Sequence, residues 1–304
     1  MNFRYFLFAI SFILFSACEK TEKVDNFPKH ESKLVTNCFF YPDTCFVFNL
    51  SKSLSPIDNA PFKNMNSSNA YIRVFENNIL FDSFRYNGPS KPVFAGTIFP
   101  KANNTYRFEC NYPGFGIVKA EDYIPDTFKV KKLSGYYTVI QSYSSTDTML
   151  WGDYSTNINI DLESIQGKNQ YLILYYNYLP VLLKNDSRYG GYYYYIPEIT
   201  DLNTTNSSEF IGSRLFVSNP NGIEKLNIKW MNEYTRLYKN RITNHYYFTI
   251  ISCSEATFEY LKRQALQIEN ENDPFAAPTP ISNNIINGYG IFGGLNVQYC
   301  KIAF

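Results

Sequence analysis

Short runs of alternating apolar and polar residues, separated by turn-forming residues, cover the chain from Lys33 onward. Such alternation predicts strands with one buried face. In the first part, strands are predicted at Leu34–Phe40, Cys45–Leu50, Ala70–Glu76, Ile79–Tyr86, Thr105–Asn111 and Gly116–Tyr123. Pro42-Asp43, Asn77-Asn78 and Pro113-Gly114 are the turn signals between paired runs. This density of strands and turns predicts a β-sandwich of immunoglobulin or transthyretin type over residues 33–128.

After Pro125 the connections become longer and richer in Asn and Ser. Further strands are predicted at Tyr136–Ser142, Asn157–Leu162, Tyr171–Tyr178, Tyr192–Ile196, Glu209–Val217, Ile223–Trp230, His245–Ser252 and within residues 289–303. The sequence therefore predicts an all-β protein of two β-sandwich-like domains. The second domain covers residues 129–304.

One helix pattern interrupts the second domain, at residues 255–268. Ser252 and Glu255 fit a capping box, in which each side chain bonds a free backbone donor of the first turn. An apolar stripe recurs at helical spacing, formed by Phe258, Leu261, Ala265 and Ile268. We expect this stripe to pack on the sheet of the second domain.

The N-terminus carries an apolar run, Phe6–Cys18, preceded by Arg4. This is the pattern of a secretory signal, and the run is too short to span a bilayer as a helix. Its end, Leu14-Phe15-Ser16-Ala17-Cys18, resembles a bacterial lipobox, although Phe15 stands where a smaller aliphatic residue is usual. We predict a signal peptide over residues 1–17, lipidation of Cys18 and a flexible tether over 18–32. The alternative is an ordinary signal peptide with a coincidental cysteine.

Composition supports this fold class and narrows the function. Aromatic residues make up 18% of the chain, which suits half-buried pleated surfaces. The 28 basic residues include Arg4, the only charged residue among residues 1–17, so the mature chain has as many bases as acids. A neutral balance argues against nucleic-acid binding, which needs a basic patch.

The cysteines and histidines predict no metal site or cofactor. Five cysteines follow Cys18 without a CxxC pair, and the two histidines, His30 and His245, are far apart in the chain. Cys38 and Cys45 flank a turn and could form a disulfide in an exported protein. The alternative is that both are free, small, buried side chains.

Three further sequence patterns resemble functional sites. Gly288–Gly293 fits GxGxxG, but it lacks the strand and helix context of a dinucleotide site, so tight turning and close packing are expected instead. The pair Glu121-Asp122 is expected to be a solvated strand end, because adjacent strand residues point to opposite faces. Tyr192, Tyr193, Tyr194 and Tyr195 cannot all enter one core, so they are the candidate partner surface.

Several motifs together resemble one family. The run LVTNCFFYPDTCFVFNLSKSLSPIDNA (residues 34–60) is similar to the opening of the domain-of-unknown-function 4249 (DUF4249) lipoproteins of the Bacteroidetes. Lys101–Tyr106, Tyr112–Phe115 and Asn287–Gly293 also resemble segments of that family. The resemblance implies an outer-membrane lipoprotein, often encoded beside a TonB-dependent receptor. It implies no established enzymatic activity and no catalytic residues.

We therefore expect a lipid-anchored outer-membrane protein, facing the cell surface or the periplasm, that serves as a non-catalytic accessory or binding protein for a TonB-dependent receptor. A structural or adhesive surface lipoprotein without a transport partner is the alternative. A glycan-active enzyme with unrecognised carboxylates is the third possibility. The sequence identifies no small ligand.

Overall fold

The structure is a computed structural model. It describes residues 30–55, 70–85, 93–145, 149–163, 170–178, 198–202, 207–212, 214–219, 222–223, 225–238, 245–271 and 273–303. In these residues the fold is all-β with one helix, as predicted, and Lys33–Phe304 form one compact unit.

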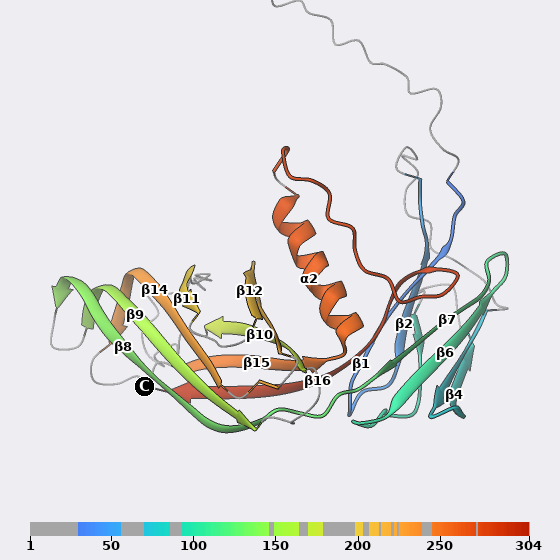
Figure 1. Ribbon diagram of the computed structural model, residues 1–304, viewed down its shortest axis with the longest axis horizontal. Coiled ribbons are helices and arrows are strands. Elements are labelled where there is room, and N and C mark those ends of the chain that lie inside the picture. The colour runs from blue at the N-terminus through green and yellow to red at the C-terminus, as the bar shows by residue number, and fades with distance from the viewer. Residues whose placement is uncertain are drawn as a thin grey trace, which may run out of the picture. The chain divides into compact units, whose positions relative to one another are not determined.

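The strands form three sheets (Figure 1). The eight-stranded sheet has the order β12-β13-β10-β15-β16-β1-β2-β5, and the four-stranded sheets have the orders β4-β3-β6-β7 and β11-β14-β9-β8. The bounds are β1 Leu34–Phe40, β2 Val47–Lys52, β3 Tyr71–Glu76, β4 Ile79–Arg85, β5 Val93–Ala95, β6 Thr105–Tyr112, β7 Gly116–Tyr123, β8 Lys129–Ser145, β9 Met149–Glu163, β10 Gln170–Tyr178, β11 Glu198–Leu202, β12 Ser207–Ile211, β13 Arg214–Asn219, β14 Lys225–Tyr238, β15 His245–Cys253, α2 Glu255–Asn270 and β16 Tyr289–Ala303.

The first sandwich packs β1 and β2 against β3, β6 and β7 around a core rich in aromatic rings. Each strand contributes every second residue to this core, as in the buried positions Ile72 and Val74 of β3 and Tyr106 and Phe108 of β6. This alternation is the reason that the sequence pattern located these strands well: Leu34–Phe40 and Gly116–Tyr123 were predicted with the bounds that the structure has.

The centre of that core comes from the other end of the chain. β16 pairs in parallel with β1 and places Phe292 in the first sandwich, fully buried. Its ring centroid lies 4.4 Å from that of Phe40 and 4.9 Å from that of Phe108. Ile285 joins the same cluster. Residues 33–128 therefore share their core with the C-terminal segment, and the eight-stranded sheet runs across the predicted domain boundary.

The second sandwich uses the other half of the eight-stranded sheet. Its inner face packs on β8, β9 and β14 through a cluster that includes Leu172, Leu174 and Ile160. Its outer face is covered by α2, which contacts β10, β12 and β16 (Figure 1). β10 is buried on both faces, because Leu172 and Leu174 point to one cluster while Ile173 points to the other.

The helix confirms part of the prediction and corrects two details. Phe258, Leu261 and Ala265 are buried against the sheet, as expected. The stripe ends there, because Ile268 is 56% exposed. The N-cap is Ser254 and not Ser252: the backbone N–H of Thr257 donates to Ser254 Oγ at 3.2 Å.

We expect Leu261→Ala to lower the free energy of unfolding by about 2–5 kcal/mol, because it leaves a cavity under the helix. Ile268→Ala, on the same helix but exposed, is the control and should change that free energy by less than about 0.5 kcal/mol. Urea denaturation of both variants measures the difference. Equal midpoints for the two variants would contradict this packing of α2.

Several strand predictions need correction or qualification. Glu209–Val217 is not one strand: β12 ends at Ile211, Gly212 turns with φ +60°, and β13 begins at Arg214. β8, β9 and β14 are much longer than their predicted cores. The predicted strand Tyr192–Ile196 lies outside the described residues.

Candidate functional site

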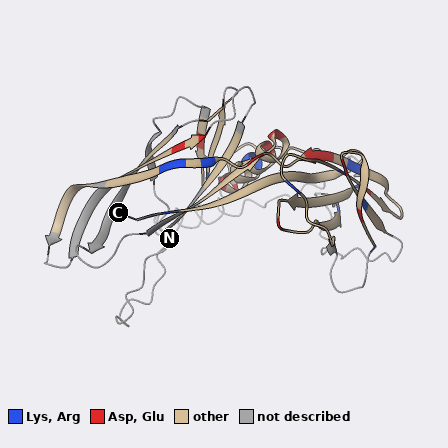
Figure 2. Cartoon of the chain, turned by 90° about the horizontal axis from the view of Figure 1, so that it is seen from below, with Lys and Arg blue, Asp and Glu red and all other residues tan. Residues whose placement is uncertain are grey.

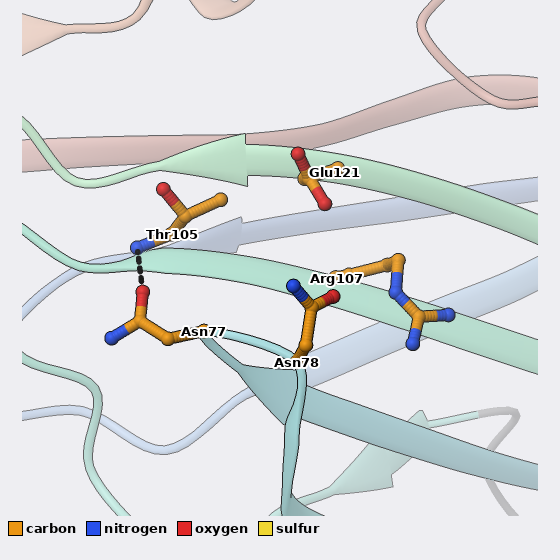
Figure 3. A pocket seen from close by; sticks show the side chains of 5 residues that line it. All are labelled: Asn77, Asn78, Thr105, Arg107 and Glu121. Carbon is orange, nitrogen blue, oxygen red and sulfur yellow. Dashed lines mark hydrogen bonds between the residues drawn. The ribbon is translucent and has the colours of Figure 1, made fainter.

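A polar pocket of about 310 Å³ lies on the outer face of the sheet β4-β3-β6-β7. Its lining comes from the β3–β4 turn and from β6 and β7, and consists of Asn77, Asn78, Thr105, Arg107 and Glu121 (Figure 3). The volume is at the small end of the range for ligand pockets. It is therefore large enough for one small ligand.

The β3–β4 turn shapes one side of the pocket. Asn77 and Asn78 both have positive φ, 48° and 69°, as a tight two-residue hairpin requires. Asn77 is tied to β6: its N–H donates to the Thr105 carbonyl at 3.0 Å, and its Oδ1 accepts from the Thr105 N–H at 3.5 Å. The side chain of Asn77 thus holds the turn in place, and Asn78 is left to face the pocket.

Arg107 is held rigidly at the edge of the pocket. Its guanidinium lies over the Phe75 ring, 4.2 Å from the centroid, and donates from Nη1 to Glu109 Oε1. Glu109 also accepts from Arg73 Nη2 at 2.8 Å. Figure 3 shows the guanidinium pointing along the sheet, away from Thr105. These contacts hold Arg107 in place without using the other polar groups of the pocket.

A second polar cluster is buried between the first sandwich and the helix. Asp122 Oδ2 accepts from Ser254 Oγ at 2.6 Å, from Gly294 N at 2.8 Å and from Thr257 Oγ1 at 3.2 Å. Ser254 is the N-cap of α2 and Gly294 belongs to β16. One carboxylate therefore joins β7, α2 and β16.

This cluster corrects the prediction that Glu121-Asp122 is a solvated strand end. Only Glu121 is exposed, whereas Asp122 is 7% exposed. Burial raises the pKa of the Asp122 carboxyl, and the hydrogen bonds from Ser254 and Gly294 oppose that rise. The signal for its burial was in the sequence: alternation places Asp122 on the same face as the buried Val118 and Ala120.

The other predicted site residues are distributed as follows. Cys18 and the tyrosines Tyr192, Tyr193, Tyr194 and Tyr195 lie outside the described residues. Cys38 and Cys45 are free cysteines in the structure, Cys38 buried and Cys45 partly exposed. A disulfide between them is not part of this fold and stays a prediction for the exported protein.

The glycines of the GxGxxG match serve close packing. A Cβ on Gly288 would lie 2.7 Å from the Leu34 carbonyl oxygen, and one on Gly290 would lie 2.2 Å from that of Thr36. β16 can therefore approach β1 only because these positions lack side chains. In the part of the chain that the structure describes, no group of three or more His, Cys, Asp or Glu side chains could hold a metal ion.

The long edge strand β8 exposes apolar side chains that sequence reasoning missed. We call residues 136–143 the β8 arm. Tyr136, Val139, Ile140 and Tyr143 are 56%, 42%, 53% and 37% exposed. Among the side chains that the structure describes here, the adjacent residues Thr138 and Val139 are both exposed, so both faces of the strand are open to solvent at this point. No charged residue occurs between Lys132 and Asp147, and in Figure 2 β8 is tan beyond the blue of its lysines.

None of the described helices has the length and apolar character that crossing a bilayer requires.

A search of curated proteins found no match to this chain. Residues 20–299 match the domain of unknown function DUF4249, which confirms the family resemblance seen in the sequence motifs. The match covers nearly the whole chain, so this protein belongs to the DUF4249 family.

Proposed function

We propose that this chain is a lipid-anchored outer-membrane protein that binds a TonB-dependent receptor and has no catalytic role. The anchor part rests on the apolar run that ends at Cys18 and on its likeness to a lipobox. The receptor part rests on what the family resemblance implies and on the exposed β8 arm. Of these, the β8 arm is the structural observation that carries the proposal.

The β8 arm has the composition of a protein interface. Exposed aromatic and aliphatic side chains that lie close together on a surface mark interaction sites more often than single exposed ones. Tyrosine is enriched in the centres of interfaces and charged residues are depleted there, and the arm contains Tyr136 and Tyr143 and no charge. β8 is also an edge strand, so its outer backbone groups are available to a partner.

Affinity purification from solubilised outer membranes tests the proposal. The wild-type chain should bring down a TonB-dependent receptor, and the double variant Tyr136→Ser/Ile140→Ser should recover at least about tenfold less, since buried interface anchors contribute roughly 2 kcal/mol or more each. Ile79→Ser/Leu80→Ser is the matched control, because Ile79 and Leu80 are 74% and 55% exposed on β4. Cys18→Ala, in the same experiment, should block lipidation and leave the chain either soluble or held in the membrane by its uncut signal peptide.

The outcomes separate the parts of the proposal. Full recovery of the receptor by the β8 arm variant would exclude the arm as the interface. Absence of any receptor from the wild-type sample would favour the structural or adhesive alternative. Membrane retention of Cys18→Ala with its signal peptide removed would contradict the lipid anchor.

A further inference from the structure

The polar pocket on the first sandwich offers a set of groups that its own fold does not use. Among the described residues, the side chains of Asn78, Thr105 and Glu121 have no hydrogen-bond or ion-pair partner. Figure 3 shows the Glu121 carboxylate and the Asn78 amide on opposite sides of the pocket, with Thr105 between β7 and the turn. The three side chains thus surround one space and are free to bind.

The three groups differ in hydrogen-bonding capacity. The Glu121 carboxylate only accepts, whereas the Asn78 amide and the Thr105 hydroxyl can both donate and accept. A complementary ligand must therefore present donors and acceptors close together on a small frame. Neighbouring hydroxyl groups on a sugar ring do this, because each hydroxyl both donates and accepts.

The charges around the pocket argue against other small ligands. An anionic ligand would meet the Glu121 carboxylate. A carboxylate of a free amino acid would need Arg107, but Glu109 and the Phe75 ring already hold that guanidinium. A simple amine could pair with Glu121, but an ammonium group only donates, so the donors of Asn78 and Thr105 would stay unused. A neutral ligand with several hydroxyl groups can form hydrogen bonds with all three side chains and places no negative charge beside Glu121.

We propose that the pocket formed by Asn78, Thr105, Arg107 and Glu121 binds a neutral saccharide unit. Glu121 accepts hydrogen bonds from two neighbouring hydroxyls of the sugar, and the Asn78 amide forms a hydrogen bond with a hydroxyl on the opposite side of the ring. The pocket lining contains one carboxylate, Glu121, whereas hydrolysis of a glycosidic bond uses two. The site therefore binds the sugar without cleaving it. This inference does not depend on the receptor, which involves the β8 arm.

Saturation-transfer NMR on the purified mature lipoprotein tests the site. The protein is kept in an amine-oxide detergent, because a glycoside detergent would itself compete. The probes are neutral methyl glycosides of glucose, galactose, mannose and N-acetylglucosamine, with galacturonate, putrescine and alanine as anionic, cationic and zwitterionic comparisons. At least one neutral glycoside should bind with millimolar affinity, as expected for a small ligand in a small pocket.

Two pocket variants and one control assign the binding to this site. Glu121→Gln and Asn78→Gly should each weaken binding about tenfold by removing one strong hydrogen bond. Glycine keeps the positive φ that Asn78 adopts, so the turn is preserved. Lys119→Gln changes an exposed residue on the same face of β7, outside the pocket, and should bind like the wild type.

The charge series adds a second readout. Galacturonate should bind more weakly than the neutral galactoside, and Glu121→Gln should reduce that difference. The proposal is overturned if no neutral glycoside binds up to tens of millimolar, or if both pocket variants bind as the wild type does. It is equally overturned if putrescine or alanine, and not a glycoside, shows binding that depends on Asn78 and Glu121.

Discussion

Asp122→Ala is expected to lower the free energy of unfolding by about 3–5 kcal/mol, because buried donors lose their acceptor, at about 1–3 kcal/mol each, and a cavity is left. The substitution removes the acceptor of the Gly294 N–H and of the Thr257 hydroxyl. The Ser254 hydroxyl also loses Asp122 and keeps Thr257 Oγ1 as its acceptor, at 3.0 Å. It also removes the side chain that joins β7 to the N-terminus of α2 and to β16. Urea denaturation measures the loss.

Two controls distinguish the network from the loss of one contact. Ser254→Ala removes the N-cap and one of the donors to Asp122, and should cost about 1–2 kcal/mol. Glu121→Ala, the exposed neighbour on β7, should change the free energy of unfolding by less than about 0.5 kcal/mol. If Asp122→Ala costs no more than Glu121→Ala, the buried cluster does not join the three elements.

The same carboxyl predicts a pH dependence. Burial raises the Asp122 pKa above 3.8, so between 3.8 and the raised value the folded state holds a proton that the unfolded state has lost. The contribution of this group to the free energy of unfolding therefore decreases as pH rises through that interval. In Asp122→Asn this contribution is absent. The free energy of unfolding of the wild type, minus that of Asp122→Asn, should thus decrease as pH rises above 3.8.

The sequence predicted local structure well because local structure depends on patterns between near neighbours. The alternation in Leu34–Phe40 and the helical spacing of Phe258, Leu261 and Ala265 each identify an element and its buried face. These patterns do not encode which strands pair. The parallel pairing of β1 with β16 joins residues about 250 positions apart, such as Val35 and Tyr289, and no turn signal marks it.

The candidate sites were harder to predict for the same reason. The pocket combines the β3–β4 turn with β6 and β7, and neither the turn signal of Asn77-Asn78 nor the pair Glu121-Asp122 indicated that they lie together. The alternation along β7 indicated that Asp122 is buried, but its partners Ser254 and Gly294 are more than a hundred residues away, so the sequence did not indicate its role. The strand Tyr136–Ser142 was predicted, but its exposure was not, because strand patterns report the buried face of a strand, and the described side chains of the arm are all exposed.

Gly290→Ala is the second substitution with a large expected effect. Gly290 has φ +114°, and an added Cβ would lie 2.2 Å from the Thr36 carbonyl oxygen and 2.9 Å from its carbonyl carbon. Both atoms are backbone of β1, so the strand itself would have to move and the parallel pairing of β1 with β16 would open. That pairing positions Phe292 in the aromatic core. We expect a loss of more than about 4 kcal/mol, in the exceptional range for one substitution.

Gly114→Ala distinguishes the cost of a positive φ from the cost of the contact between the added Cβ and the backbone of β1. Gly114 also has positive φ, +89°, but no atom lies within 4 Å of the position that its Cβ would take. It should therefore show the backbone cost alone, about 1–2 kcal/mol. The excess in Gly290→Ala then measures the close approach of β16 to β1. Equal unfolding midpoints for the two variants would mean that β1 shifts freely, and that the C-terminal strand is not what holds the first sandwich closed.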